Sequence, residues 1–341
     1  AKERVQETMS NGRRRHSLAY ELFWKSAFVV SLVVVCWMLY YATQKIDYVW
    51  RWYRVPQYFI SEQVIEVKAA FQGEVKSLTP DGVNTNVLVV GDGEEELYPV
   101  PTEGLRVSKG DTVYTGDVLG GVKKIVPGIL VEGTWLTLYV SAVSIFFGII
   151  LGLFTGLARL SDNPFLRWWS ITYIELIRGS PLLVQIYIWY FVLGTLVNNL
   201  LSKSDLPQVP TLWFGVASMA VFTGAYVAEI VRAGIQSIHR GQREAARSLG
   251  MNAYESMRHI VLPQAFRRIL PPLAGQFISL IKDSSLLGII AIRELTKATR
   301  EVVTVSLQPF EIFFVCSLLY LLLTFGLSLL TNYLERKLVQ S

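Results

Sequence analysis

Residues 131–158 read VEGTWLTLYVSAVSIFFGIILGLFTGLA, and Glu132 is the only charged residue among them. A helix that crosses a bilayer needs about 20 mostly apolar residues, so this stretch is long enough for one transmembrane helix. Comparable apolar runs lie at residues 27–43, 170–198, 211–235, 266–292 and 309–334. The sequence therefore predicts an all-α polytopic membrane protein with about six transmembrane helices.

The composition excludes other broad classes. The chain is 52% hydrophobic and only 17% charged, which is less charge than soluble domains carry. Its net charge of +5 does not indicate nucleic-acid binding, because the basic residues lie between the apolar runs, as the positive-inside rule expects. Cys36 and Cys316 lie within apolar runs without metal-ligand spacing, so we expect both to pack as small hydrophobic side chains.

The first apolar run follows basic residues 13–16, a layout shared by cleaved signal sequences and retained signal anchors. Its end carries Trp37, Tyr40 and Tyr41 instead of a small-residue cleavage site, which favours a retained helix. We therefore expect a cytoplasmic tail at residues 1–26 and an anchor helix at 27–44. The aromatic and basic segment that follows is expected to lie on the membrane surface or to act as a linker.

Between residues 64 and 122 the spacing of apolar residues changes to short alternating stretches, which include Val87 with Val89 and Leu97 with Pro99. Turn residues punctuate these stretches at 80–82 and 91–93. We expect a small β-domain inserted after the first helix. Residues 107–120 resemble a hairpin of lipoyl-like barrels, but no lysine stands at the tip of a matching hairpin, so no attached cofactor is expected.

Alternation of the runs from a cytoplasmic N-terminus predicts the side of each loop. The insert, residues 45–126, then lies outside the cytoplasm, whereas loop 238–268 and the C-terminus lie inside. Ten basic residues fit this topology at the inner side, namely Arg159, Arg167, Arg240, Arg243, Arg247, Arg258, Arg267, Arg268, Arg336 and Lys337. Three others fall on the outer side against the rule, namely Arg293, Lys297 and Arg300.

Two short helices are expected within loop 238–268. The first covers about residues 242–249 and ends at Gly250, a residue suited to the left-handed position after a helix. Asn252 and Glu255 form a capping-box-like start for the second, and Pro263 is expected to end it. The helices carry two apolar faces, which either dock onto a partner or fold back onto this chain: Ala245, Ala246 and Leu249 on the first, and Tyr254, Met257 and Val261 on the second.

Two parts of this loop, GQREAARSLGM at residues 241–251 and IVLPQA at 260–265, together resemble the EAA loop of ABC-transporter permeases of the polar amino-acid uptake family. Three neighbouring stretches are similar to the same family: ELIRGSPLLVQ at 175–185, GAYVAEIVRAGI at 224–235 and KDSSL at 282–286. The resemblance covers residues 127–341 and implies the core of a type I importer permease. The anchor helix and the β-domain depart from the family pattern.

The resemblance implies a permease subunit of an ATP-driven amino-acid importer in the bacterial inner membrane. Its partners would be cytoplasmic ABC ATPase subunits, a second permease chain of the same or a homologous kind, and an external amino-acid-binding protein. The chain has no G-x-x-x-x-G-K-[ST] motif, so we expect it to be no enzyme and to bind no cofactor, with ATP and Mg on the ATPase. The docking residues would be Glu244, Ala245, Ala246, Leu249, Gly250, Tyr254, Met257, Leu262 and Pro263.

Polar and ionisable residues inside apolar runs are candidates for the substrate pathway, because they are costly in a membrane. The candidates are Glu175, Arg178, Gln185, Glu229, Arg232, Lys282, Asp283 and Ser285. Glu175 with Arg178, and Glu229 with Arg232, stand three residues apart and could each neutralise themselves across a helix turn. Such groups either anchor and join helices or line a passage for a zwitterionic amino acid.

Two rival functions explain less of the sequence. A secondary transporter needs no docking loop and usually has inverted repeats, which we do not find. A membrane-anchored β-domain receptor would need only one of the six apolar runs.

Overall fold

The computed structural model describes residues 18–91 and 93–339. Basic residues 13–16, on which the sidedness of the first helix depends, lie outside the described residues. The chain divides into two units, 1–51 and 52–341. In the first unit, helix α2 (Leu18–Lys45) covers the predicted anchor run, and Trp37 stacks on Tyr41 with ring centroids 5.5 Å apart.

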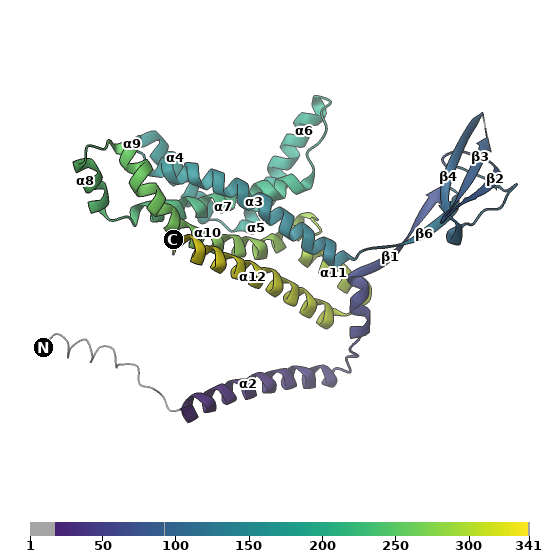
Figure 1. Cartoon of the computed structure of the whole chain (residues 1–341), viewed down its shortest axis with the longest axis horizontal. Coiled ribbons are helices and arrows are strands. Elements are labelled where there is room, and N and C mark those ends of the chain that lie inside the picture. Colours follow the sequence, from purple (N-terminus) through teal and green to yellow (C-terminus); the bar gives the residue numbers. More distant parts are fainter. Residues whose placement is uncertain (1–17, 92, 340–341) are drawn as a thin grey trace. The chain divides into compact units, whose positions relative to one another are not determined.

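Six helices of the described residues are long and apolar enough to cross a membrane, which confirms the predicted polytopic helical fold. Their segments are α2, α3 (Ile129–Arg159), the run α5–η3–α6 (Leu182–Lys203), α7 (Thr211–Gln236), the run α9–η4–α10–η5 (Ala253–Ile290) and α12 (Pro309–Val339). Figure 1 shows α3, α7, α10 and α12 running along one another in the second unit.

The composition of the third apolar run predicted one helix over residues 170–198. The structure instead has a break within this run. Helix α4 (Pro164–Arg178) ends at Gly179, and α5 (Leu182–Tyr187) begins after Pro181. Proline has no N–H to donate and disfavours helical backbone at the preceding residue, so the chain breaks here. The candidate span continues through the π-helix η3 (Ile188–Gly194) and α6 (Thr195–Lys203).

Helices α3 and α7 make the most extensive contact of any two helices that the structure describes. Gly148, Gly152 and Gly156 of α3 face α7, and a Cβ added at Gly152 would lie 2.5 Å from the Cβ of Val227. Small residues let two membrane helices approach closely in this way. Helix α7 is consequently the most buried of the six spans.

A short polar segment after the fifth apolar run contains a buried carboxylate. After α10 (Leu262–Asp283) and the 3₁₀-helix η5 (Ser284–Ile290), the fully buried Glu294 caps helix α11 (Leu295–Ser306) by accepting from two of its backbone N–H groups. Glu301 pairs with Arg293 at 2.8 Å and with Lys297 at 3.7 Å. Two of the three basic residues that the predicted topology places on the outer side thus share one carboxylate.

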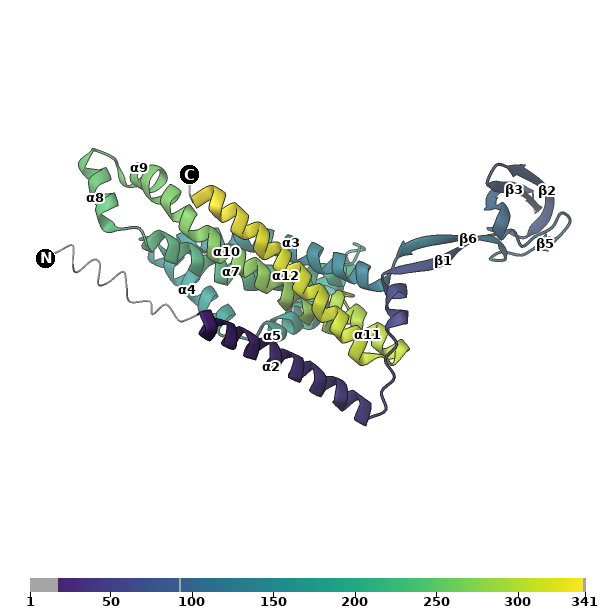
Figure 2. The same ribbon diagram turned by 60° about the horizontal axis from the view of Figure 1, so that its bottom comes forward.

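Residues 60–127 form two β sheets. Strands β1 (Ile60–Lys68) and β6 (Val118–Pro127) pair as an antiparallel ribbon, after the 3₁₀-helix η1 (Trp52–Tyr58). The second sheet has the order β4–β3–β2–β5, and Figure 2 shows β2, β3 and β5 curling around one another. Its strands are β2 (Gly73–Asp81), β3 (Asn84–Gly91), β4 (Glu94–Pro101) and β5 (Thr112–Val113), and the 3₁₀-helix η2 (Thr102–Gly104) follows β4.

In β3, buried and exposed side chains alternate as expected, and Val87 and Val89 are fully buried. In β4 the buried side chains are Tyr98 and Val100, so Leu97 and Pro99 lie on the exposed face. The register explains this, because Tyr98 stands opposite Val87 in the sheet. Burial, together with a hydrogen bond to Glu96, raises the pKa of Tyr98.

Two glycine turns shape the segment before β6. Gly110 and Gly116 have φ values of 94° and 92°, which only glycine adopts without strain. The carboxylates of the following residues, Asp111 and Asp117, accept from the backbone N–H groups of Ser108 and Tyr114. The repeated Gly-Asp pairs therefore build two similar turns.

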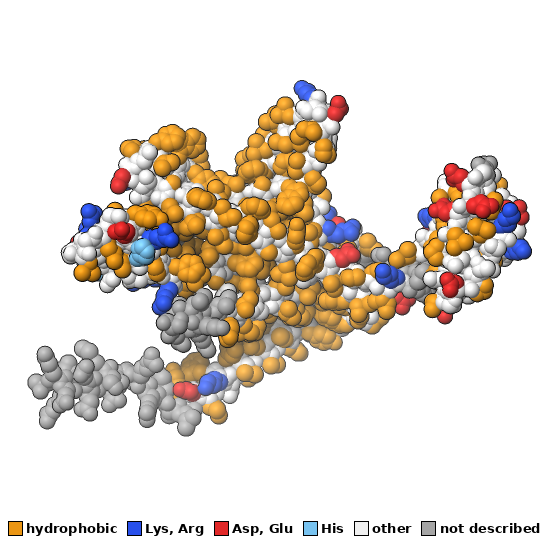
Figure 3. Space-filling view, turned by 45° about the horizontal axis from the view of Figure 1, so that its top comes forward, with side chains coloured by type: hydrophobic (Ala, Val, Ile, Leu, Met, Phe, Trp, Pro, Cys, Tyr) orange, Lys and Arg blue, Asp and Glu red, His pale blue; other side chains and the backbone are white. Residues whose placement is uncertain are grey.

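Charge and apolar surface separate along the chain. Figure 3 shows hydrophobic side chains over most of the visible helical surface, with charged side chains gathered on the β sheets and near helix ends. An exposed apolar surface of this extent suits contact with lipid.

Candidate functional site

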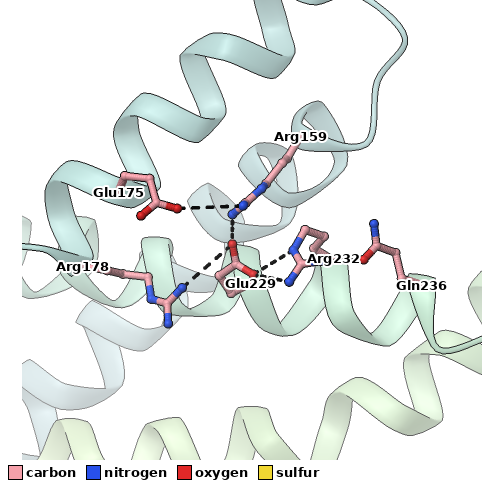
Figure 4. A network of polar contacts seen from close by, with 6 residues as sticks. All are labelled: Arg159, Glu175, Arg178, Glu229, Arg232 and Gln236. Carbon is pink, nitrogen blue, oxygen red and sulfur yellow. Dashed lines mark hydrogen bonds and ion pairs between the residues drawn. The ribbon is translucent and has the colours of Figure 1, made fainter.

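Five charged residues from three helices form one network centred on Glu229. Arg159 comes from the end of α3, Glu175 and Arg178 come from α4, and Glu229 and Arg232 come from α7 (Figure 4). All five lie near the last turns of their helices. The sequence prediction included four of them, but not Arg159.

Glu229 is the centre of this network. Its Oε2 lies 2.7 Å from Nη2 and 2.8 Å from Nε of Arg232, so two nitrogens of one guanidinium group contact the same carboxylate oxygen. Its Oε1 pairs with Arg159 and lies 3.9 Å from Nη1 of Arg178. The Glu229 side chain is only 16% exposed, so these contacts are little screened by water.

The pairing differs from the sequence expectation. Glu229 pairs with Arg232 within one helix, as predicted. Among the described residues, however, Glu175 pairs with Arg159 at 3.9 Å and forms no ion pair with Arg178. The guanidinium of Arg178 instead lies 5.3 Å from the ring centroid of Tyr226, as a cation–π contact. The network therefore joins α3, α4 and α7 rather than neutralising α4 by itself.

Three arginines and two glutamates leave one positive charge in excess. A cavity of about 450 Å³ opens beside them, between α4, α7 and α10. Its lining includes Arg178, Glu229 and Arg268 together with the small residues Ala233 and Gly234. An ion of either sign, or a zwitterion, would meet an opposite charge here.

The other pathway candidates lie elsewhere. Gln185 of α5 is buried, and its amide group donates to the carbonyls of Ile177 and Ser180, so it joins α4 to α5. Lys282 and Asp283 are the last residues of α10, and Ser285 lies just after them in η5. From Arg268 to Lys282 the helix rises about 20 Å, at ~1.5 Å per residue. The structure therefore does not bring all eight candidates into one site.

The second candidate site is the pair of helices beyond the end of α7. Helix α8 (Arg240–Ser248) ends before Gly250, whose φ is 91°, and α9 (Ala253–Ser256) starts with a complete capping box between Asn252 and Glu255. Both features were predicted. Gly250 therefore turns the chain sharply, and the capping box fixes the start of the next helix.

Pro263 does not end the second helix, contrary to the prediction. The chain continues from α9 through the π-helix η4 (Met257–Val261) directly into α10, and Pro263 is the second residue of α10. In η4 the backbone bonds reach one residue further, as the bond from Leu262 N–H to the carbonyl of Met257 shows. A proline near the start of the next segment is tolerated because the first N–H groups there need no helical partner.

The two apolar faces of this loop are partly buried against this chain and partly exposed, so part of them is free to bind a partner. Ala246 and Val261 are buried within the chain, and Met257 and Leu262 pack against a cluster formed with α7. Leu249 and Tyr254 remain 81% and 68% exposed. The remaining predicted docking residues, Glu244, Ala245, Gly250 and Pro263, are exposed as well.

Contacts from side chains hold this loop against the helix ends. Arg243 donates to the carbonyl of Ile235 at 3.4 Å, and Arg268 donates to the carbonyl of Ser237. His239 caps α8 through Nδ1, which accepts from the backbone N–H of Gly241 at 3.1 Å. Force on the exposed part of the loop would thus reach α7 and α10.

Comparison with known proteins matches the helical part. Residues 148–340 match the family described as the binding-protein-dependent transport system inner membrane component. The glutamine transport system permease protein GlnP of Escherichia coli (strain K12) is 36% identical over 209 residues, which are 61% of this chain and 92% of that protein. The L-cystine transport system permease protein TcyB of Bacillus subtilis (strain 168) is 36% identical over 211 residues, 62% of this chain and 86% of that protein.

One solved structure agrees with these relatives. The crystal structure of an amino acid ABC transporter with histidines superimposes with a TM-score of 0.54 at 34% identity, and the match covers 61% of this chain and 94% of that one. Helix α2 and the β strands precede the residues that match the family.

Proposed function

Because the chain belongs to the family of binding-protein-dependent transport system inner membrane components, and within it to the amino-acid ABC-transporter permeases, we propose that it forms the translocation pathway of an ATP-driven amino-acid importer. It is a multi-pass membrane protein and a transporter subunit rather than an enzyme. In the proposed complex a separate cytoplasmic ABC ATPase holds ATP and Mg, and an external binding protein delivers the amino acid.

The observation that carries this proposal is the exposed surface of α8 and α9. Leu249 and Tyr254 present apolar surface on both sides of the left-handed turn at Gly250, in the segment that joins α7 to α10. Exposed apolar groups on two well-capped helices are suited to a partner's cleft. The small side chain of Ala245 allows that partner to approach closely. We assign this surface to the ATPase.

The substitution Leu249→Asp tests the docking surface. A carboxylate placed in a desolvated cleft should reduce recovery of the complex with the ATPase, and with it ATP-driven uptake, at least tenfold. The matched control is Val83→Asp, because Val83 is 83% exposed in the turn between β2 and β3. We expect the control to leave the ATPase complex intact. Full recovery of the complex with Leu249→Asp would refute this docking surface.

The proposed topology combines a cytoplasmic N-terminus with six spans, an even number that places both termini on the same side. Residues 1–26 form a cytoplasmic tail, 27–44 an anchor helix, 45–126 an extracytoplasmic insert and 127–341 the permease core, with loop 238–268 in the cytoplasm. Arg159, Arg240 and Arg268 would then lie on the cytoplasmic side, where basic residues are favoured. The β sheets would lie on the side of the binding protein.

Cysteine labelling tests this topology. In a chain with Cys36 and Cys316 replaced by alanine, a membrane-impermeant thiol reagent should label Val83→Cys from outside the inner membrane. It should label Ser248→Cys only after the membrane is permeabilised. Labelling of both from the same side would contradict the arrangement.

For the pathway itself, we assign the network around Glu229 to the cytoplasmic end, and Gln185, Lys282, Asp283 and Ser285 to positions further across the membrane. Mixed charges can meet both ends of a zwitterionic amino acid. Replacing Arg178 by Gln should lower uptake and substrate-stimulated ATP hydrolysis together. If both rates stay unchanged in a well-folded variant, Arg178 is not part of the pathway.

We assign the uncovered apolar face of α5 and η3 to a second permease chain, identical or homologous. Val184, Ile188, Phe191 and Val192 are all exposed on this face. Cross-linking between cysteines placed at Val192 in two chains should trap a dimer in the assembled transporter.

A further inference from the structure

A second polar cavity lies where α3, α4 and α7 meet, on the side of the network that Arg178 does not reach. Its volume is about 440 Å³. The lining includes Arg159, Asp162, Arg167, Arg232 and Gln236. Three guanidinium groups thus face one carboxylate, Asp162, in a space large enough for a phosphate-sized anion.

The three arginines are not equally engaged. Arg232 is held on both sides, by Glu229 and by Gln236. Arg159 shares Glu229 with Arg232 and is also 3.9 Å from Glu175. Arg167 is exposed and forms no ion pair with any residue that the structure describes. Its five donors, together with those of Arg159 that the carboxylates do not occupy, are available to an anion.

Beside this polar cavity there is an apolar one, on the neighbouring face of helix α4. It measures about 420 Å³ and is lined by Pro164, Phe165, Trp168, Trp169 and Thr172. The aromatic side chains are largely exposed, and the rings of Phe165 and Trp169 meet edge to face at 6.4 Å. Tryptophan is enriched where a membrane protein crosses the lipid–water boundary.

Helix α4 therefore has the properties of a helix that lies in the membrane interface. It follows α3 after a turn of four residues, 160–163, and it lies beside the end of α7, so its start is at the level where two spanning helices end. One face carries Arg167 toward the basic cavity, and the next carries aromatic side chains away from it. An amphipathic helix with this division binds lipid through both faces at once.

We propose that these two cavities form one binding site for an anionic phospholipid. The headgroup phosphate accepts hydrogen bonds from Arg159 and Arg167, while the acyl chains lie against Phe165, Trp168 and Trp169. A free phosphate would leave the aromatic cavity empty, whereas a lipid uses both cavities and reaches them from the bilayer. The inference needs only that the chain spans a membrane, and it is independent of the proposed docking surface.

The bound lipid would also act on the Glu229 network. Arg159 contributes to the cavity and to the ion pair with Glu229. A phosphate on Arg159 competes with Glu229 and Glu175 for the same guanidinium group. Anionic lipid would therefore loosen the contact between α3 and α7 at their ends.

Native mass spectrometry of the full chain tests the site. The protein is equilibrated in mixed micelles with phosphatidylglycerol or phosphatidylcholine of the same acyl chains, and the retained lipid is counted. The wild-type chain should retain phosphatidylglycerol in preference to phosphatidylcholine. Arg167→Gln should reduce this retention about fivefold, the loss expected for one basic residue at an anionic lipid surface. Arg106→Gln, an exposed arginine of the β region, serves as the matched control and should retain phosphatidylglycerol like the wild type.

Further variants distinguish an anionic phospholipid from free phosphate as the ligand. Arg167→Lys should restore most of the retention, and Trp168→Ala should lower it for phosphatidylglycerol without a change in the thermal unfolding midpoint. Equal retention of the two lipids by the wild type, or unchanged retention by Arg167→Gln, would overturn the site. If inorganic phosphate displaces the bound anion and Trp168→Ala has no effect, the cavity takes free phosphate and the lipid assignment is wrong.

Discussion

The charge network around Glu229 and the proposed docking surface on α8 and α9 differ in how the fold makes them. The network is assembled from three helices, and its central carboxylate is only 16% exposed. The docking surface comes from one short stretch of chain and presents Leu249 at 81% exposure. A substitution in the network should therefore change stability first, whereas one on the docking surface should change assembly first.

Glu229→Gln should have the largest effect on stability. Arg159, Arg178 and Arg232 would lose their shared carboxylate, and breaking a buried pair from one side costs about 3 kcal/mol or more. We expect a marked drop in the thermal unfolding midpoint in detergent. Glu175→Gln is the matched control in the same network, because its side chain is 67% exposed and its contact is long. Equal shifts for the two variants would remove Glu229 from the centre of the network.

Gly152→Ala should have the next largest effect, because it separates the helices that bring Arg159 to Glu229. The new Cβ would meet the Cβ of Val227 at 2.5 Å, and overpacking of this kind costs roughly 1–3 kcal/mol. Adding Val227→Ala should recover part of the lost unfolding midpoint. If the double variant is no more stable than Gly152→Ala alone, steric contact with Val227 is not the cause.

Gly250→Ala tests the backbone turn that holds the proposed docking surface, and its effect should be smaller and local. At a φ of 91° alanine is strained by about 1–2 kcal/mol, although nothing lies near the new Cβ. The strain should unfold the turn locally, so amide exchange in α8 and α9 should speed up while the global midpoint changes little. Gly275→Ala within α10 is the control, since it also meets no neighbour and has no positive φ. Unchanged exchange in α8 and α9 would show that the turn tolerates alanine.

Asn252→Ala should have the smallest effect of the four. It removes one half of the capping box, worth about 1 kcal/mol to the start of α9. We expect faster exchange at the first N–H groups of α9 only. Exchange that also increases around Glu229 would show that the docking surface and the network are one cooperative unit.

The local features of α8 and α9 could be predicted because their causes are near in sequence. Gly250 and the box between Asn252 and Glu255 act over a few residues, and both were predicted correctly. Pro263 was misjudged because the π-helix before it is set by packing of Val261 and Met257 against α7, which the local sequence does not specify. Whether Ala246 is buried or exposed depends on the same tertiary contacts.

The network could be predicted only in part. The depth and sign of Glu229 and Arg232 marked them as candidates, since charges in apolar runs are conspicuous. Arg159 was read only as a basic residue at a helix end, because its partners stand far away in the sequence on α4 and α7. The break at Pro181 was also missed, although proline after Gly179 and Ser180 was a sufficient signal to separate α4 from the spanning helix.

The most direct test of the account is the energy source of transport. The chain should be reconstituted into vesicles with an ABC ATPase subunit and an amino-acid-binding protein, and uptake of labelled amino acid should be measured with and without ATP. The account predicts uptake that requires ATP and the ATPase and that is lost with Leu249→Asp. Uptake driven by an ion gradient alone, without the ATPase, would contradict it.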